Sequence, residues 1–223
     1  AVLTHMSSAP IDTGGQPPPR RIAQSPRPEA VSGFEGIQRY WDPGTSHWTA
    51  KILPGEFYVT RSEEVISTVL GSCIAACIRD PQAGIGGMNH FMLPMGECDE
   101  GLATRYGCVA MECLINELLK RGAERERLEI KLFGGGQILG AATRIGARNI
   151  EFAHRYLATD DLGIVAEDTG GSYPRRVAYF PASGQAFVRR LRTPEQQALA
   201  DRERSYLAQV HATADAGDVE LFD

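Results

Sequence analysis

The stretch VISTVLGSCIAACI, residues 65–78, decides the architecture of the chain. Residues 65–70 form an apolar, β-branched run that stops at Gly71, and residues 74–78 form a second apolar run. Short runs of this kind, bounded by glycine, are typical of buried strands. The pattern therefore predicts two buried strands joined by a sharp turn that carries Cys73.

Similar short runs on both sides of this stretch indicate further strands. They are separated by turns that Gly, Pro, Asp or Ser mark, such as the Pro-Gly pair at residues 54–55. We expect strands at residues 51–53, 57–60, 84–93, 128–133, 164–167, 176–180 and 185–191. The strands between residues 65 and 93 are expected to form a tight meander, in which each strand pairs with the next.

Two longer segments have the period of a helix instead. Residues 103–121 place Met111, Leu114 and Leu118 on one helical face, and residues 143–157 repeat this pattern. The two helices do not alternate regularly with the strands, as they would in an α/β fold. The sequence therefore predicts an α+β fold, a layered sandwich of mixed β-sheet with two main helices packed on it.

The two ends of the chain differ from the middle in composition. Residues 1–36 hold six of the 13 prolines and little apolar surface, so we expect a disordered tail there. Residues 194–223 are predicted to be a polar tail, first helical and then frayed from about residue 215. Residues 37–193 remain as the folded domain.

The overall composition excludes several classes of protein. The 23 Lys+Arg and 28 Asp+Glu residues give a net charge of −5, which argues against a nucleic-acid partner. No apolar stretch approaches the roughly 18–20 residues that span a bilayer, so we expect no direct membrane insertion. Five cysteines without paired spacing argue against a disulfide framework. These features predict a cytoplasmic protein.

The turn at Cys73 is the strongest candidate for chemistry. Gly71 permits a sharp turn, which would leave the Cys73 thiol exposed at the end of a strand. Converging backbone N–H groups in such a turn lower the pKa of a thiol and stabilise an oxyanion. The candidate oxyanion donors are the N–H groups of Gly71, Ser72, Cys73 and Ile74.

A histidine at the end of a nearby strand is the natural partner of this thiol. Cys73 and His90 together would form a thiolate–imidazolium nucleophile. A hydroxyl of Ser67 or Thr68, on the strand before the cysteine, could fix the tautomer of the histidine. From the residues alone, a buried structural cysteine and an ordinary hydrogen-bonded histidine remain the alternative.

The other cysteines and the glycine run are interpreted as structural. We expect Cys77 in the core, and Cys108 and Cys113 as packing residues of the first predicted helix. No second pair of ligands with metal spacing exists, so neither a metal nor an organic cofactor is expected. The glycines at residues 134–136 lack the lysine ending of a phosphate-binding loop. They are predicted to form a wall that another backbone segment can approach.

Eight short motifs are spread over about residues 52–191. They read LPGE (53–56), VLGSC (69–73), GMNHFMLP (87–94), RYG (105–107), AME (110–112), KLFGGG (131–136), IGARN (145–149) and DTGG (168–171). In combination they resemble the chemoreceptor glutamine deamidase family, CheD. The Gly-Ser-Cys sequence with a downstream Asn-His-Phe-Met-Leu-Pro is the most specific part of this resemblance.

The resemblance implies roles for individual residues. Cys73 matches the nucleophile of the family and His90 matches its histidine. The third member is a threonine on the strand before the cysteine, where position favours Ser67 and residue type favours Thr68. Neighbours on a strand point to opposite faces, so only one of the two can serve unless a bulge intervenes.

The resemblance also implies the activity. It is that of a protein-glutamine glutaminase, which converts glutamine side chains of chemoreceptors to glutamate through a cysteine thioester and needs no cofactor. Family members also bind a CheC-type chemotaxis phosphatase, so a catalytically silent adaptor is an alternative. A general cysteine peptidase is a third interpretation. The absence of a papain-type Cys-Trp pair and the short gap between Cys73 and His90 argue against it.

Overall fold

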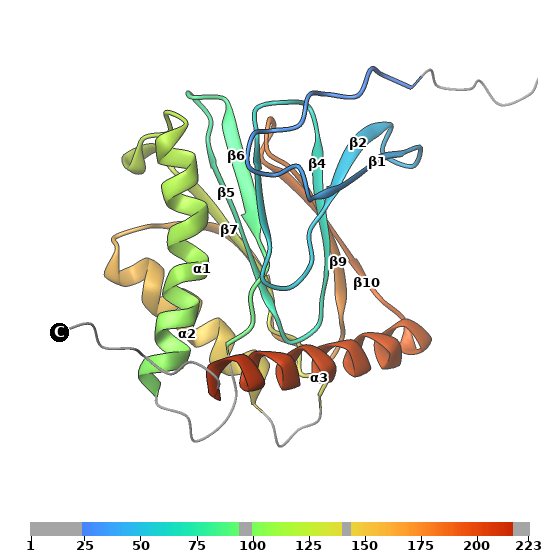
Figure 1. The fold of residues 1–223 in the computed structure, drawn as a ribbon, viewed down its shortest axis with the longest axis vertical. Helices are drawn as coiled ribbons and strands as arrows, with labels where there is room; N and C mark the ends of the chain where they lie inside the picture. Colours follow the sequence, from blue (N-terminus) through green and yellow to red (C-terminus); the bar gives the residue numbers. More distant parts are fainter. Residues whose placement is uncertain (1–23, 94–99, 140–143, 216–223) are drawn as a thin grey trace, which may run out of the picture.

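Two mixed β-sheets and three long helices form the structure (Figure 1). The computed structural model describes residues 24–93, 100–139 and 144–215. The first sheet has the strand order β1 (Gln38–Asp42), β2 (His47–Lys51), β4 (Val65–Leu70), β9 (Arg175–Phe180) and β10 (Gln185–Arg190). The second sheet has the order β3 (Phe57–Thr60), β6 (Ile85–Asn89), β5 (Ile74–Asp80), β7 (Glu129–Gly134) and β8 (Ile164–Thr169). Most neighbouring strands are antiparallel, but β2–β4 and β7–β8 are parallel pairs.

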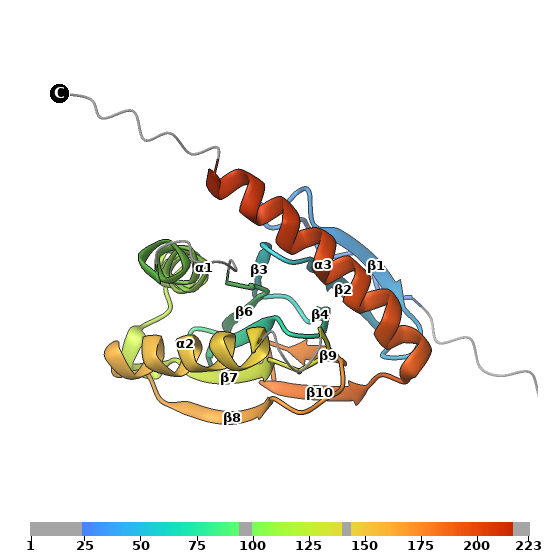
Figure 2. The ribbon, with the colours of Figure 1, turned by 90° about the horizontal axis from the view of Figure 1, so that it is seen from below.

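The helices cover two sides of this sandwich. Helices α1 (Glu100–Lys120) and α2 (Ile145–Thr159) pack against the second sheet, while the first sheet lies on its other side (Figures 1 and 2). A short 3-10 helix, η1 (Arg125–Arg127), leads from α1 into β7. Helix α3 (Thr193–Asp215) runs across the lower end of both sheets in Figure 1. The predicted α+β layered sandwich is confirmed, with α3 as a third main helix.

The strands around the central stretch do not form the predicted meander. Strand β4 pairs with β2 and β9 of the first sheet, whereas β5 pairs with β6 and β7 of the second. Both runs are buried along almost their whole length, so each needs neighbours on both edges and cover on both faces. Residues 71–73 therefore carry the chain from one sheet to the other, and a local pattern does not contain this information.

The segment before β1 packs on the domain. Phe34 is only 8% exposed, and its ring makes edge contacts with the rings of Phe57 and Tyr58 at centroid distances of 5.2 and 5.4 Å. The indole nitrogen of Trp48 also donates to the carbonyl of Ser25 at 3.0 Å. The predicted disordered tail is thus wrong for residues 24–36, because one aromatic ring anchors a polar segment. Residues 1–23 lie outside the described part of the chain.

The C-terminal segment is helical, as predicted, but it belongs to the fold. Among the side chains of α3 that the structure describes, the buried ones lie at positions that share one face of the helix. They are Leu199, Ala200, Glu203 and Leu207. Leu207 joins the main hydrophobic core, and Leu199 and Ala200 form a smaller cluster with Ile138. Residues 216–223, for which fraying was predicted, lie outside the described part.

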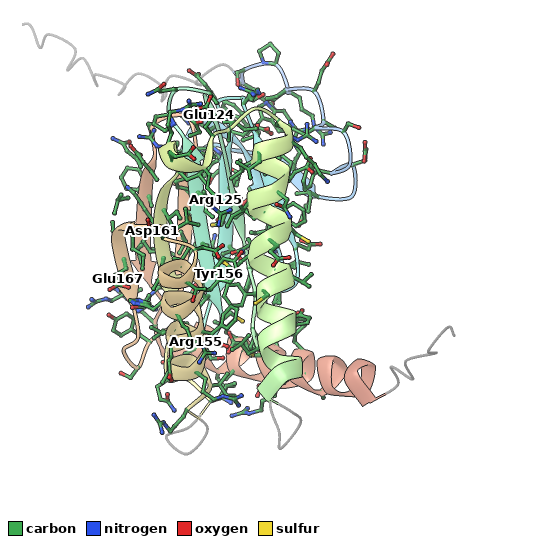
Figure 3. All side chains as sticks on the ribbon, turned by 90° about the vertical axis from the view of Figure 1, so that its left-hand side faces the viewer. Glu124, Arg125, Arg155, Tyr156, Asp161 and Glu167 are labelled. Carbon is green, nitrogen blue, oxygen red and sulfur yellow. The ribbon has the colours of Figure 1, made fainter. Side chains whose placement is uncertain are left out.

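The side of the molecule that carries α2 and β8 is polar. Figure 3 shows Arg155 of α2 and Glu167 of β8 among the side chains on this side. The imidazole of His154 lies 2.8 Å from the Glu167 carboxylate, and both side chains are largely exposed. Because these charged side chains are exposed, this side is interpreted as a solvated surface. An exposed pair of this kind contributes little to stability.

Candidate active site

A run of three glycines holds the Cys73 turn from behind. The N–H of Gly135 donates to the carbonyl of Cys73, and the N–H of Gly136 donates to that of Gly71, both at 2.7 Å. Gly134 has a φ of +114°, and a Cβ atom there would lie 2.0 Å from the carbonyl oxygen of Cys73. Only glycine permits so close an approach. The predicted wall of glycines behind the turn is confirmed.

The third carbonyl of the turn is held by α2. The side-chain amide of the fully buried Asn149 donates to the Ser72 carbonyl at 2.8 Å. Its oxygen accepts from the N–H of Leu93 at 3.0 Å. Asn149 therefore ties the turn to the segment that follows His90. All three carbonyls of residues 71–73 thus accept hydrogen bonds from the glycine run or from Asn149. The N–H groups of Gly71 and Ser72 point to the opposite side of the turn.

On the other side, two N–H groups converge on the Glu203 carboxylate of α3. The N–H of Gly71 donates to it at 3.0 Å, and the N–H of Ser72 donates at 3.0 and 3.1 Å to its two oxygens. The hydroxyl of Ser72 adds a hydrogen bond of 2.6 Å. Successive N–H groups that converge in this way form an anion-binding nest. The nest is formed in this structure and is filled by a carboxylate that is buried, at 2% exposure.

The predicted oxyanion donors are thus only partly available. The N–H groups of Gly71 and Ser72 point at the carboxylate, as an oxyanion site requires. The N–H of Ile74 instead donates to the carbonyl of Phe91 at 2.9 Å, within a short bridge between β5 and the segment after β6. Ile74 is therefore removed from the set of predicted donors, because its N–H already belongs to the second sheet.

The backbone fixes His90 beside this turn. Its N–H donates to the carbonyl of Glu56 at 3.0 Å, and its carbonyl accepts from the N–H of Gly55 at 2.8 Å. The antiparallel register of the Ile74–Phe91 bridge, continued by one residue, places Cys73 and His90 as diagonal neighbours on one face. Diagonal neighbours are within reach of a long or aromatic side chain.

A hydrogen bond to Thr68 defines the tautomer of His90. Nδ1 of His90 lies 2.8 Å from Oγ1 of Thr68, and this hydroxyl donates to the carbonyl of Ile52 at 2.8 Å. A hydroxyl has one proton, so Thr68 accepts at the imidazole and Nδ1 carries the hydrogen. Nε2 of His90 then carries a lone pair. It is buried and has no hydrogen-bond partner within the described residues.

Of the two hydroxyls that the sequence left open, the structure brings Thr68 to the histidine. Ser67 is the neighbouring residue of β4, and its carbonyl accepts from the N–H of Ile52 at 3.0 Å. No side-chain hydrogen bond joins Ser67 to His90 among the described residues. The alternation of side chains along a strand accounts for this difference between the two neighbours.

Burial sets the protonation states of the pair. Burial raises the pKa of the Cys73 thiol well above its usual value, and the negative charge of the Glu203 carboxylate adds to the effect. Burial also lowers the pKa of His90 to about 3, although the carbonyl of Ile52 opposes the shift. At neutral pH both groups are uncharged. The predicted exposed thiolate–imidazolium pair is therefore wrong for this structure, in which Cys73 is 0% exposed.

The remaining cysteines differ in their surroundings. Cys77 is buried in the core, as predicted, and burial raises its pKa. Cys108 is half-buried, but Cys113 is exposed and does not have the predicted packing role. Within the described ranges, no group of three or more His, Cys, Asp or Glu side chains is arranged to hold a metal ion. Cys98 lies outside those ranges.

Besides Asn149, two residues that support the turn were not identified from the sequence. Arg175 is fully buried, donates to the carbonyls of Gly134 and Gly170, and pairs with Asp168 at 3.2 Å, so it holds the glycine run in place. Glu203 lies at the nest itself. It interrupts an apolar stripe at four-residue spacing between Leu199 and Leu207, and this interruption is the one signal that the sequence contains.

A cavity of about 800 Å³ lies between α3 and the first sheet. Its lining includes Thr68, His90 and Glu203, together with the cationic side chains of Lys51 and Arg176. Cys73 does not line it. The cavity thus reaches His90 and Glu203, while the residues of the turn, including Cys73, do not line it. None of the helices in the described ranges is long and apolar enough to cross a membrane.

Comparison with known proteins agrees with these motifs. A family model described as CheD chemotactic sensory transduction matches residues 92–190. A protein of Halorhodospira halophila is 50% identical over 203 residues, which cover 87% of this chain and 94% of the relative. A protein of Hydrogenovibrio crunogenus is 52% identical over 191 residues, which cover 83% of this chain and 100% of the relative. Each is named a probable chemoreceptor glutamine deamidase CheD.

Proposed function

Because the chain belongs to the CheD family, we propose that it deamidates glutamine side chains of chemoreceptors to glutamate, with Cys73 as nucleophile. The observation that carries this proposal is the nest of Gly71 and Ser72, the two residues before Cys73, which already binds a carboxylate. A carboxylate has the charge of a tetrahedral oxyanion and the chemistry of the product. The same donors therefore suit both species.

Proton transfer within the buried pair starts the reaction. Nε2 of His90 takes the proton of the Cys73 thiol, which produces the thiolate that attacks. The imidazolium formed keeps its Nδ1–H on the oxygen of Thr68, so the ring does not turn away. In this scheme Thr68 positions the histidine, and the carbonyl of Ile52 orients the hydroxyl of Thr68.

Acylation follows at the side-chain amide of the substrate. The sulfur of Cys73 bonds to the amide carbon, and the oxyanion accepts hydrogen bonds from the nest and from the Ser72 hydroxyl. Collapse of this intermediate breaks the C–N bond, and His90 gives its proton to the leaving nitrogen, which departs as ammonia. A thioester of Cys73 remains.

Hydrolysis of the thioester completes the cycle. Neutral His90 takes a proton from water, the resulting hydroxide attacks the thioester carbon, and the sulfur leaves with the proton that His90 returns. The product is a glutamate side chain, and this sequence of steps uses only groups of the chain and water. A neutral amide on a receptor helix becomes a carboxylate, so repulsion between neighbouring charges shifts the signalling equilibrium by a modest free energy.

Peptide mass mapping of a purified receptor cytoplasmic domain tests this proposal. We expect selected receptor glutamines to gain about one dalton with the wild type and none to do so with Cys73→Ser. Cys73→Ser changes one buried atom, so its circular dichroism spectrum should match that of the wild type. Receptor fragments would instead indicate a peptidase. An unmodified receptor would contradict the proposal and favour an adaptor, and co-purification with a CheC-type phosphatase would then test that role.

A further inference from the structure

The place of Glu203 calls for an explanation beyond packing. Its carboxylate is buried, yet no cation pairs with it among the residues that the structure describes. Its hydrogen bonds from described residues come from the active-site turn: the N–H groups of Gly71 and Ser72 and the Ser72 hydroxyl. A buried charge is costly unless donors satisfy it, so these donors form a site whose chemistry selects a carboxylate.

We propose that α3 is a built-in product mimic: Glu203 occupies the position of the product glutamate, and the groove beneath α3 is where a substrate helix docks. This inference rests on the proposed deamidase function. The product of that reaction is a glutamate side chain that projects from a helix, and Glu203 is such a side chain. Its carboxylate contacts the nest of Gly71 and Ser72, the two residues before the nucleophile, where the product carboxylate would lie at the end of hydrolysis.

The attachment of α3 suits an element that a substrate can displace. Its buried face is a narrow stripe of Leu199, Ala200, Glu203 and Leu207 on an otherwise polar helix. Beyond the nest, Tyr206 forms a hydrogen bond of 2.7 Å with the hydroxyl of Tyr106. Two longer, exposed contacts near the start of the helix join Gln196 to the Ser172 carbonyl at 3.5 Å and Glu195 to Arg189 at 3.8 Å. Only residues 191 and 192 link α3 to β10, so a rotation at this link moves the whole helix away from the turn.

The covered state is also a resting state. While Glu203 fills the nest, no oxyanion can enter it, and the Cys73 thiol has no access to solvent. The cavity beside α3 is lined by His90 and Thr68 but not by Cys73, so a substrate in this cavity alone would not reach the thiol. Substrate and α3 therefore compete for one groove, and the helix reduces activity until a substrate helix displaces it.

Glu203→Gln turns the mimic into a substrate and provides the sharpest test. The Cys73 sulfur would bond to the amide carbon of the introduced glutamine, the C–N bond would break, and ammonia would leave with the proton of His90. Water would then hydrolyse the thioester and regenerate the original glutamate. We expect the chymotryptic peptide that holds position 203 to gain about one dalton on incubation of the purified full chain.

Two controls accompany this variant. The double variant Cys73→Ala/Glu203→Gln should keep the lower mass, because no nucleophile is present. Gln197 lies on the exposed side of the same helix and should stay unmodified in every sample. If the introduced glutamine persists while the wild type deamidates receptors, Glu203 does not occupy the product position and the inference falls. If it is converted while receptors are untouched, the mimic stands and the receptor function fails. If neither glutamine reacts, both proposals fall.

Alkylation measures the cover directly and does not depend on turnover. In Glu203→Ala we expect iodoacetamide to label Cys73 about ten-fold faster than in the wild type, with the exposed Cys113 as an internal reference. Asp201→Asn removes the same charge from an exposed position of α3 and should leave the labelling rate of Cys73 within about two-fold. Equal labelling of Cys73 in Glu203→Ala and Asp201→Asn would overturn the inference.

Discussion

The active-site turn is held in different ways on its two sides. Behind it, the carbonyls of residues 71–73 accept hydrogen bonds from Gly135, Gly136 and Asn149, which belong to the core. In front, its N–H groups bind one carboxylate on a helix that a two-residue link joins to the sheet. The back is therefore scaffold, whereas the front binds a single side chain, which is where the proposed exchange with substrate would take place.

Gly134→Ala breaks the back of the turn and should have the largest effect. The new Cβ would meet the Cys73 carbonyl oxygen at 2.0 Å, in a backbone conformation with a φ of +114°. Strain and overlap together are expected to lower the free energy of unfolding by about 4 kcal/mol. Urea denaturation measures this loss.

A matched glycine serves as the control for Gly134→Ala. Gly163 has open space around its Cβ position, so Gly163→Ala should change the free energy of unfolding by less than about 1 kcal/mol. Equal stability of the two alanine variants would show that the turn does not depend on the glycine run. The scaffold role of the back would then be wrong.

The next prediction concerns Ser67 and Thr68, the two neighbouring hydroxyl residues of β4, and which of them positions His90. Thr68→Val removes the oxygen that accepts from His90 and should lower turnover by roughly ten- to a hundred-fold, about 1.4 to 2.7 kcal/mol of barrier. Ser67→Ala should leave turnover within a few-fold, because no hydrogen bond joins Ser67 to the histidine among the described residues. Melting temperatures of the two variants separate a loss of positioning from a loss of stability. Similar turnover in both variants would remove Thr68 from the mechanism.

Much of this site follows from the sequence, and the rest fails for identifiable physical reasons. The residues alone leave a structural cysteine and histidine as the alternative, and the resemblance to the CheD family is what assigns Cys73 and His90 to the two ends of the proposed proton transfer. The choice between Ser67 and Thr68 was not predictable, because alternation along a strand does not say which face is inward. The contact between Ser72 and Glu203 spans 131 residues, and local patterns carry no information on such a distance.

The fold shows the same division. Element positions such as residues 57–60 and 65–70 follow from local runs and are confirmed. Pairing partners do not follow, since β4 and β5 lie next to each other in sequence but in different sheets. Phe34 falls in the predicted tail, because a single aromatic residue among polar neighbours produces no periodic pattern. In the structure its burial anchors the segment.

Low pH should lower the free energy of unfolding, because His90 is buried in its neutral form. The pKa of His90 is about 3 in the folded chain against a usual value of 6.5, so the unfolded state binds the proton first. Stability is therefore fully present above pH 6.5 and falls as the pH drops towards 3, by at most about 1.4 kcal/mol per pH unit. Denaturant unfolding at pH 7, 6, 5 and 4 measures this slope. His90→Gln removes the titration, so an unchanged slope in that variant would assign the pH dependence to other groups.

Truncation of the N-terminus should affect the turn least, since its packed part lies on Phe57 and Tyr58 rather than on either side of residues 71–73. Deletion of residues 1–23 removes a proline-rich, weakly apolar stretch, and we expect unchanged turnover and a melting temperature within about 1 °C. Deletion of residues 1–36 also removes the buried ring of Phe34, so the melting temperature should fall by several degrees while deamidation persists at low temperature. Differential scanning calorimetry and receptor mass mapping on the two truncated chains measure both quantities.

Equal melting temperatures would show that Phe34 does not anchor its segment. A loss of turnover at unchanged stability would instead show that the N-terminus contributes to the front of the turn.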